Sequence, residues 1–251
     1  MLNILLCGCG GRMGAAVAAA ATAAGDRIVA GVAINPAADS PFPIFTSPEE
    51  FSGRADVIID FSHHSAVSSL VAYATRTGTP LVVATTGHTE DEVAAMHAAA
   101  GQIPLFFSRN MSLGINLLMA LCRRCALTLG DDFDIEIIEK HHNRKLDAPS
   151  GTALMLADAI TEATATEHPY VYDRHSERRA RAKGEIGLHA VRGGTIVGEH
   201  DVLFAGKDEV ITLSHSATSR EVFATGALRA AHFMVGKSAG FYNMDDVVGT
   251  L

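Results

Sequence analysis

The sequence predicts an α/β protein in which a doubly wound parallel sheet is joined to a second α+β domain with a mixed or antiparallel sheet. Three observations carry this prediction. Short, almost wholly apolar runs alternate with helix-like segments in the first part of the chain, a glycine-rich turn follows the first apolar run, and three long strand-like runs come in succession later. Strands that are apolar throughout suit a parallel sheet that helices cover on both faces.

The first part of the chain supplies the elements of the parallel sheet. Its strand candidates are short and apolar, and they occupy residues 3–7, 27–33, 56–61, 80–84 and 104–107. Helix-like segments separate several of them, at residues 13–24, 65–77 and 90–100. Alternation of this kind is typical of βαβ units, whose strands lie parallel in one sheet.

The pattern changes after residue 111. Helix candidates follow at residues 114–129, 150–162 and 221–235, and strand candidates at 133–139, 185–192, 195–204 and 209–216. Gly193 and Gly194 form a two-residue hairpin signal, so we expect the strands on either side to pair. We therefore expect a first domain over residues 1–111 and a second over residues 112–220, with residues 221–251 as a candidate segment for return to the first domain.

Composition and charge exclude several classes of protein. With 48% hydrophobic and 19% charged residues the chain is globular, and its formal charge of −8 argues against nucleic-acid binding. The most apolar segment, residues 15–24, is about half the length that a membrane helix needs. The four cysteines are too few and too clustered for a disulfide framework: Cys7, Cys9, Cys122 and Cys125. We expect a cytoplasmic protein without membrane association.

The glycine-rich turn after the first strand candidate favours dinucleotide binding. Glycines let the backbone approach a pyrophosphate closely, and the start of a helix offers free N–H groups and the positive end of its dipole. The spacing fits G-x-x-G-x-x-G, and a plain tight turn is the alternative. Its place at the start of an alternating α/β chain predicts a Rossmann-like site, with cofactor contacts from Gly8, Cys9, Gly10, Gly11, Arg12 and Met13.

The end of the second strand candidate lacks the acidic residue that commonly binds the ribose hydroxyls of NADH. Ile34 and Asn35 stand there, and neither is an acid or a base. Arg12 is either a contact for the 2′-phosphate of NADPH or a solvated arginine at a helix start. We therefore expect NADH or NADPH as cofactor, with Asn35 as a contact and the preference between them open.

Polar loops follow the fourth and fifth strand candidates. Because ligands of such sheets bind outside the carboxyl ends of the strands, these loops are placed to line the nicotinamide half of the site. Ordinary polar loops are the alternative. The residues concerned are Ala84, Thr85, Thr86, Ser108, Arg109, Asn110 and Met111.

Residues 139–152 carry the chemistry. Ser150 is the expected N-cap of a helix, so the N–H groups of Gly151 and Thr152 would form an anion site. Lys145 adds a point charge suited to a carboxylate, and His141 and His142 are of the residue type that transfers protons near neutral pH. A solvated basic loop before a capped helix is the alternative. Adjacent histidines point in different directions on most backbones, so no metal site is expected.

Five motifs resemble the 4-hydroxy-tetrahydrodipicolinate reductase family over essentially the whole chain. They are GCGGRMG (8–14), DFS (60–62), ATTG (84–87), EKHHNRKLDAPSGTA (139–153) and RGGTIVGEH (192–200). The resemblance implies hydride transfer from NAD(P)H to a small cyclic dicarboxylate, giving tetrahydrodipicolinate and water in the diaminopimelate route to lysine. It also implies a dinucleotide-binding first domain, and a second domain that binds substrate and assembles a homotetramer through its sheet.

The resemblance assigns roles as well. His141 matches the family's proton donor, and Lys145 matches a proton donor or substrate anchor. His142, Ser150, Gly151 and Thr152 match the substrate-holding stretch. Arg220, before the last helix candidate, is a candidate contact for the cofactor or a carboxylate, or a surface arginine. A charged pair that some members carry after the second strand is absent here, which suggests use of both nicotinamide cofactors.

Two other functions are compatible with the domain pattern. One is a nicotinamide dehydrogenase that acts on a different amino or semialdehyde acid, and its turnover would not depend on His141. The other is a dinucleotide-sensing protein whose second domain binds a partner, which gives no reason for Lys145 and two histidines beside an anion-binding helix start.

Overall fold

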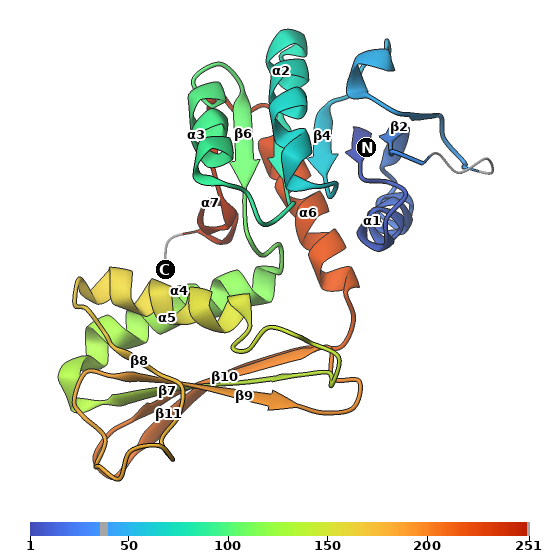
Figure 1. Cartoon of the computed structure of the whole chain (residues 1–251). Helices are drawn as coiled ribbons and strands as arrows, with labels where there is room; N and C mark the ends of the chain where they lie inside the picture. The colour runs from blue at the N-terminus through green and yellow to red at the C-terminus, as the bar shows by residue number, and fades with distance from the viewer. Residues whose placement is uncertain (36–39, 250–251) are drawn as a thin grey trace. The chain divides into compact units, whose positions relative to one another are not determined.

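A computed structural model of the chain describes residues 1–35 and 40–249. These residues form two compact units (Figure 1). Unit 1 contains Met1–Leu113 and Arg220–Val248, and unit 2 is made mainly of Gly114–Ser219. Both internal boundaries fall within two residues of the expected ones. The expected first domain also included residues 250–251, which lie outside the described residues.

Unit 1 is built on a seven-stranded sheet in the order β12-β6-β5-β4-β1-β2-β3, and every pair of neighbours is parallel. The predicted parallel sheet is therefore confirmed. Its strands are β1 (Asn3–Cys7), β2 (Arg27–Val32), β3 (Ile44–Phe45), β4 (Val57–Asp60), β5 (Leu81–Val83), β6 (Pro104–Phe107) and β12 (Gly240–Tyr242).

Helices cover both faces of this sheet (Figure 1). The helices are α1 (Arg12–Ala23), α2 (Val67–Thr77), α3 (Glu90–Ala99), α6 (Glu221–Met234) and α7 (Met244–Val248). Ile4 and Leu6 of β1 belong to the core formed with α1, α6 and α7, whereas Leu5 and Cys7 belong to the core formed with α2 and α3. Successive side chains of a strand point to opposite faces, so a strand covered on both sides must be apolar throughout.

Unit 2 contains a mixed five-stranded sheet in the order β11-β10-β7-β9-β8. Its strands are β7 (Asp134–His141), β8 (Tyr170–Val171), β9 (Ile186–Arg192), β10 (Gly198–Ala205) and β11 (Val210–Ala217). The helices α4 (Leu113–Leu129) and α5 (Gly151–Thr164) lie along one face of it (Figure 1). Ile135, Ile137, Leu188 and Phe204 contribute to the core on that face.

The hairpin expected at Gly193 and Gly194 is wrong. The strand β7 lies between β9 and β10, parallel to the first and antiparallel to the second. The two glycines hydrogen-bond to the end of β7 instead: Gly193 N donates to His141 O at 2.9 Å, and Asn143 N donates to Gly194 O at 3.3 Å. Inserting β7 gives its apolar residues a neighbour on each side, and this outweighs the local turn signal. The hairpin of unit 2 joins β10 to β11.

The segment Leu113–Asp132 is long and apolar enough to cross a membrane by length and composition alone. The core helix of a globular protein passes the same test. In this structure Ile115, Met119 and Cys122 of α4 are buried in the core of unit 2. One third of its apolar window is buried inside the described structure, and Leu117 and Leu127 are exposed.

Candidate active site

The glycine-rich turn lies between β1 and α1, as predicted. Gly8 has a φ of +78°, and a Cβ there would overlap the backbone of Phe61 and Ser62. Gly14 is equally constrained, because its Cβ would overlap the Gly8 carbonyl and the backbone of Cys9. The N-cap of α1 is Gly11, which makes no side-chain capping bond, and the first turn holds no acidic residue. The turn therefore fits a pyrophosphate, because the glycines allow close approach and no acidic residue in the first turn of α1 would repel it.

Replacing Gly14 with Ala tests how tightly the turn is packed. The added Cβ meets backbone atoms that cannot rotate away, so we expect a net loss of about 2 kcal/mol in the free energy of unfolding after the gain in helix propensity. Gly11→Ala is the matched control, since its Cβ would lie 3.4 Å from Gly8 O, an ordinary contact. Urea unfolding of the ligand-free protein measures both. Equal stability of the two variants would contradict the packing argument.

Two cavities adjoin this turn in unit 1. The glycine cavity, of about 460 Å³, is lined by Gly8, Gly10, Gly11 and Asn35 together with the hydroxyl residues Ser47, Ser65 and Ser69. The strand-end cavity, of about 450 Å³, is lined by Met13, Ala84, Thr85, Thr86, Arg109, Asn110 and Met111. Phe61, Ser62 and His63 line both. Most of the expected cofactor contacts thus line two adjoining cavities.

Four expected cofactor contacts do not line either cavity. Cys9 packs near β2, with its Sγ 3.5 Å from the Val32 carbonyl. Arg12 is exposed at the start of α1, and Arg220 directly precedes α6. Ser108 is buried and donates its hydroxyl to Asn110 O at 2.8 Å. Their contacts with the cofactor stay predictions.

A buried carboxylate, Asp60, organises the strand-end cavity. It accepts hydrogen bonds from Thr85 Oγ1 at 2.7 Å and from Ser62 Oγ at 2.5 Å, as well as from the Ser62 N–H at 3.0 Å. Burial raises the pKa of Asp60, and the hydrogen bonds from Ser62 and Thr85 oppose that rise. Because both hydroxyls donate to Asp60, the oxygens of Ser62 and Thr85 remain able to accept a hydrogen bond.

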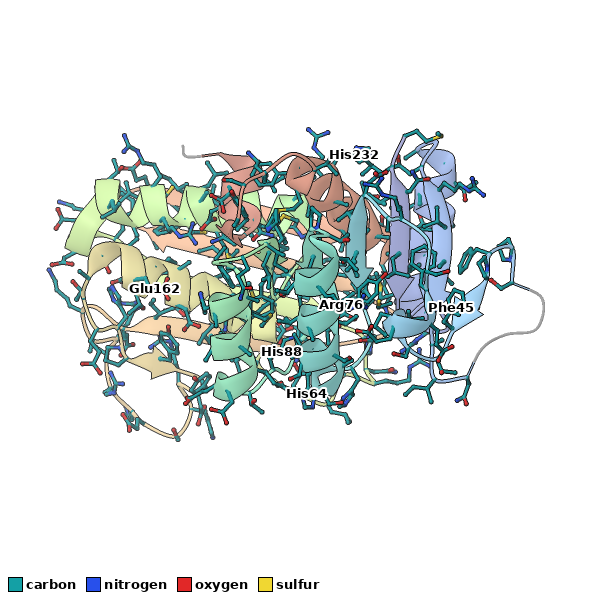
Figure 2. The ribbon with its side chains drawn as sticks, turned by 90° about the horizontal axis from the view of Figure 1, so that it is seen from above. Phe45, His64, Arg76, His88, Glu162 and His232 are labelled. Atoms are coloured by element: carbon teal, nitrogen blue, oxygen red, sulfur yellow. The ribbon has the colours of Figure 1, made fainter. Side chains whose placement is uncertain are left out.

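Histidines that the sequence analysis did not select lie beside the same cavity. His63 and His64 line it, and His64 Nδ1 lies 3.0 Å from both carboxylate oxygens of Glu92. His88 lies on the loop before α3, and its Nδ1 is 3.4 Å from Oε2 of Glu92 in that helix. Figure 2 shows His64 and His88 close together. The rule that ligands bind at the carboxyl ends of parallel strands selected the loops after β5 and β6. Applied to the end of β4, the same rule would have selected His63 and His64 as well.

The candidate proton donor lies in unit 2, at the end of β7. His141 Nδ1 is 2.6 Å from Oε2 of Glu139, whose side chain is fully buried. Arg192 donates two hydrogen bonds of 2.7 Å to the same carboxylate. The ring of His141 is 12% exposed and lies against Gly198, where a Cβ would be 3.1 Å from Nε2. His142 directly follows β7.

The predicted N-cap of α5 is confirmed. Ser150 Oγ accepts a hydrogen bond from Ala153 N at 3.2 Å, and Gly151 and Thr152 begin the helix. His200 Nε2 lies 3.0 Å from the same Ser150 Oγ. Burial, reinforced by the charge of His141, lowers the pKa of His200 to about 4, so His200 is neutral at physiological pH. The first turn of α5 carries no acidic residue that would repel an anion.

Lys145 lies in the loop between His141 at the end of β7 and the start of α5. Its Nζ is 2.8 Å from Oδ1 of Asp147, and its side chain is 20% exposed against 60% for Asp147. The hydrogen bond from Lys145 lowers the pKa of Asp147. Because its only described ion-pair partner is a largely exposed carboxylate, the ammonium can exchange that partner for a ligand carboxylate at low cost.

Comparison with known proteins identifies the family. The chain matches "Dihydrodipicolinate reductase, N-terminus" over residues 2–111 and "Dihydrodipicolinate reductase, C-terminus" over residues 114–248. It is 51% identical to the 4-hydroxy-tetrahydrodipicolinate reductase of Caldanaerobacter subterraneus subsp. tengcongensis, covering 99% of this chain and 98% of that protein. It is 47% identical to the enzyme of the same name from Clostridium tetani, covering 98% and 96%.

A solved structure has the same fold. Dipicolinate-bound dihydrodipicolinate reductase from Paenisporosarcina sp. TG-14 aligns with a TM-score of 0.81 at 24% identity, covering 97% of each chain. The sequence matches extend over both units and include the motifs around His141 and the glycine-rich turn. The chain therefore belongs to the 4-hydroxy-tetrahydrodipicolinate (dihydrodipicolinate) reductase family, the NAD(P)-dependent oxidoreductases of lysine and diaminopimelate synthesis.

Proposed function

We propose that the loop of residues 141–152 binds the twice-negative ring of 4-hydroxy-tetrahydrodipicolinate, and that His141 protonates it during reduction. One observation carries the proposal: an imidazole held by a buried carboxylate, an ammonium group and a helix start without an acidic residue all occur between the end of β7 and the first turn of α5. Lys145 and the N–H groups of Gly151 and Thr152 bind the carboxylates. Two separate anion-binding groups match a ligand with two carboxylates.

The chemistry needs a proton donor at this place. Once bound, reduced nicotinamide supplies a hydride. Hydride addition to the conjugated imine that remains after loss of water leaves an electron-rich enamine, which must take up a proton. In our proposal His141 supplies this proton from Nε2, because Nδ1 is engaged with Glu139. Lys145 and the start of α5 hold the ring in one orientation, which lowers the entropic part of the barrier.

A direct assay tests the proposal. The purified chain is mixed with freshly prepared 4-hydroxy-tetrahydrodipicolinate, and the absorbance of NADH or NADPH is followed. We expect oxidation of the nicotinamide that depends on substrate and is inhibited by dipicolinate, a planar ring with the same two carboxylates. Absence of turnover with either cofactor would overturn the proposal.

We propose further that the enzyme uses both NADH and NADPH. The glycine cavity, as far as the described residues line it, contains no Asp, Glu, Lys or Arg. Asn35 and the serines Ser47, Ser65 and Ser69 are all uncharged and able to donate hydrogen bonds. Such a lining suits ribose hydroxyls and does not repel a 2′-phosphate.

Asn35→Asp should convert this tolerance into a preference. A carboxylate there repels the 2′-phosphate of NADPH and accepts hydrogen bonds from the ribose hydroxyls of NADH. We expect the ratio of kcat/KM for NADH to that for NADPH to rise by about tenfold or more, equivalent to about 1.4 kcal/mol. Steady-state kinetics with each cofactor measure it, with Asn35→Ser as the uncharged control. An unchanged ratio in the Asp variant would place the 2′-position elsewhere.

The remaining expectations concern assembly and location. We propose a homotetramer formed through the sheet of unit 2, where Val191 and Val210 are large apolar residues left exposed in the single chain. Multi-angle light scattering measures the oligomeric state, and a monomer at micromolar concentration would overturn this part. A biosynthetic role also supports a cytoplasmic location without a membrane or nucleic-acid partner.

A further inference from the structure

The buried carboxylate of Glu139 contacts both the proton donor and the anion site. Its Oε2 accepts from His141 Nδ1 at 2.6 Å, and its Oε1 accepts from the Ser150 N–H at 3.0 Å. Arg192 donates to both oxygens at 2.7 Å, so the carboxylate receives four hydrogen bonds in a fully buried position. We infer that Glu139 is a positioning residue that fixes the tautomer of His141 and joins the proton donor to the start of α5. This inference rests on the proposed function.

The charge of Glu139 determines which nitrogen of His141 carries the proton. Burial works to raise the pKa of Glu139, but the hydrogen bonds from Arg192 and His141 outweigh it and hold the pKa below its ordinary value. An ionised carboxylate can only accept hydrogen bonds, so the Nδ1 of His141 must be the donor. Nε2 is then the position where the ring takes up and releases a proton.

The surroundings of His141 leave Nε2 for the ligand. Gly198 of β10 is the neighbour on that side, and it has no side chain to compete for the nitrogen. Among the described residues, Glu139 on β7 contacts the ring and His200 on β10 lies 5.3 Å from it between ring centroids, while Arg192 on β9 binds the carboxylate of Glu139. Among them, Glu139 makes the direct contact with Nδ1.

The same carboxylate also holds the anion site. Through Ser150 N it fixes the residue that caps α5, and Arg192 extends the contact to the Asp147 carbonyl at 2.7 Å. Both ends of the segment from His141 to Ser150 are thus tied to one buried group. A substitution of Glu139 should therefore impair proton transfer and substrate binding together, and leave the affinity for the cofactor in unit 1 unchanged.

Glu139→Gln tests this because an amide cannot satisfy all four donors. Either orientation of the amide turns its NH₂ toward Arg192 and toward one of His141 Nδ1 and Ser150 N. We expect kcat to fall at least about tenfold, KM for substrate to rise, and the Kd of NADH to stay unchanged.

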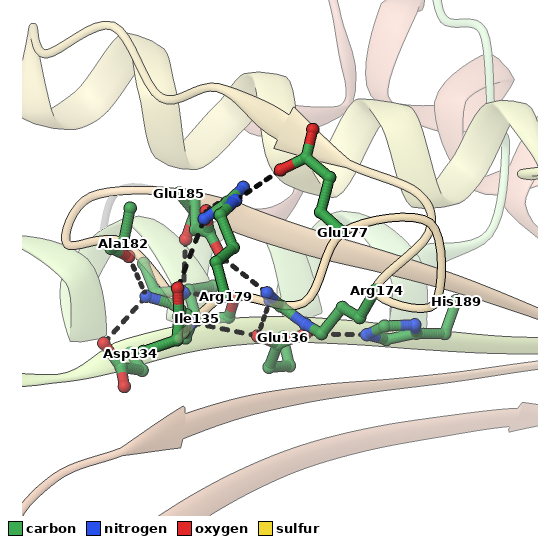
Figure 3. Close-up of polar contacts among 11 residues, drawn as sticks. Asp134, Ile135, Glu136, Arg174, Glu177, Arg179, Ala182, Glu185 and His189 are labelled. Carbon is green, nitrogen blue, oxygen red and sulfur yellow. Dashed lines mark hydrogen bonds and ion pairs between the residues drawn. The ribbon is translucent and has the colours of Figure 1, made fainter.

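Glu136→Gln is the matched control. Glu136 lies on the opposite face of β7 and also accepts from a histidine and arginines: His189 Nε2 at 2.7 Å, Arg181 Nε at 3.0 Å and Arg174 (Figure 3). The same substitution there removes the same charge from a similar network. Glu136 lies near the start of β7, whereas His141 is the last residue of that strand. We expect its kcat, KM and pH profile to match those of the unchanged enzyme.

The tautomer itself can be read without substrate. Nitrogen-15 spectra of histidine-labelled protein, with His141 assigned by its loss in His141→Gln, should show neutral His141 protonated on Nδ1 in the unchanged chain and in Glu136→Gln. A proton on Nε2 in the unchanged chain would overturn the inference, and so would Glu139→Gln kinetics equal to those of Glu136→Gln. If the unchanged chain shows no turnover, the proposed function fails, while the spectra still decide the role of Glu139.

Discussion

Replacing His141 with Gln should lower kcat by about 10²- to 10⁴-fold, the range expected for loss of a general acid. Glutamine can donate a hydrogen bond from a similar position, but it cannot transfer a proton to the enamine. Because the cavities proposed to bind the nicotinamide cofactor lie in unit 1 and His141 lies in unit 2, the Kd of NADH should change less than about twofold. Steady-state absorbance and a fluorescence titration of NADH measure the two quantities.

His189→Gln provides the control for this prediction. His189 also belongs to the sheet of unit 2 and also contacts a glutamate, with its Nε2 2.7 Å from Glu136. It belongs to the network of Figure 3 and makes no described contact with residues 141–152. We expect kcat to be unchanged in this variant. A similar fall of kcat in both variants would mean that a disturbed sheet in unit 2, and not the loss of a proton donor, accounts for the effect.

The sheet of unit 1 could be predicted because its signals are local. Each strand is short and apolar and is bounded by polar or glycine residues, and its position in the alternation sets its place in a parallel sheet. The same regularity located Thr85 and Arg109, since the carboxyl ends of parallel strands meet at one edge. The hydroxyls of Ser47 and Ser69 in the glycine cavity were missed, because no rule applied to the chain places them beside the turn.

The organisation of unit 2 depends on contacts that are distant in sequence. Glu139 and Arg192 are 53 residues apart, and the pairing of β7 with both β9 and β10 brings Glu139 together with Arg192 and with His200. A two-residue glycine signal predicts a hairpin from its own neighbourhood and carries no information about a third strand. The sequence therefore indicated His141, Lys145 and Ser150 as candidates for the chemistry, but not the buried carboxylate that contacts His141 and Ser150. Asp60 in unit 1 was quoted only as part of the DFS motif, and its contact with Thr85, 25 residues away, was not predicted.

Replacing Lys145 with Met should lower kcat/KM by about 10- to 100-fold. Methionine has a similar length but removes the charge, and a hydrogen bond to a charged group is worth about 1.5–3 kcal/mol, with each 1.4 kcal/mol a factor of ten. The loss should appear mainly in KM for substrate, because the ammonium binds a carboxylate that is present before and after hydride transfer. Lys140→Met is the matched control, since Lys140 on β7 is paired with Glu199 at 3.1 Å and Asp201 at 3.0 Å.

The division between KM and kcat separates the two roles that the family resemblance leaves open for Lys145. A substrate anchor raises KM when it is lost, whereas a proton donor lowers kcat at saturating substrate. The geometry favours the anchor, because Lys145 Nζ is already held by an exposed carboxylate, Asp147, that a substrate carboxylate can replace. His141, in contrast, has a buried carboxylate partner that holds its ring in place. A kcat for Lys145→Met as low as that for His141→Gln, with KM unchanged, would reverse this assignment.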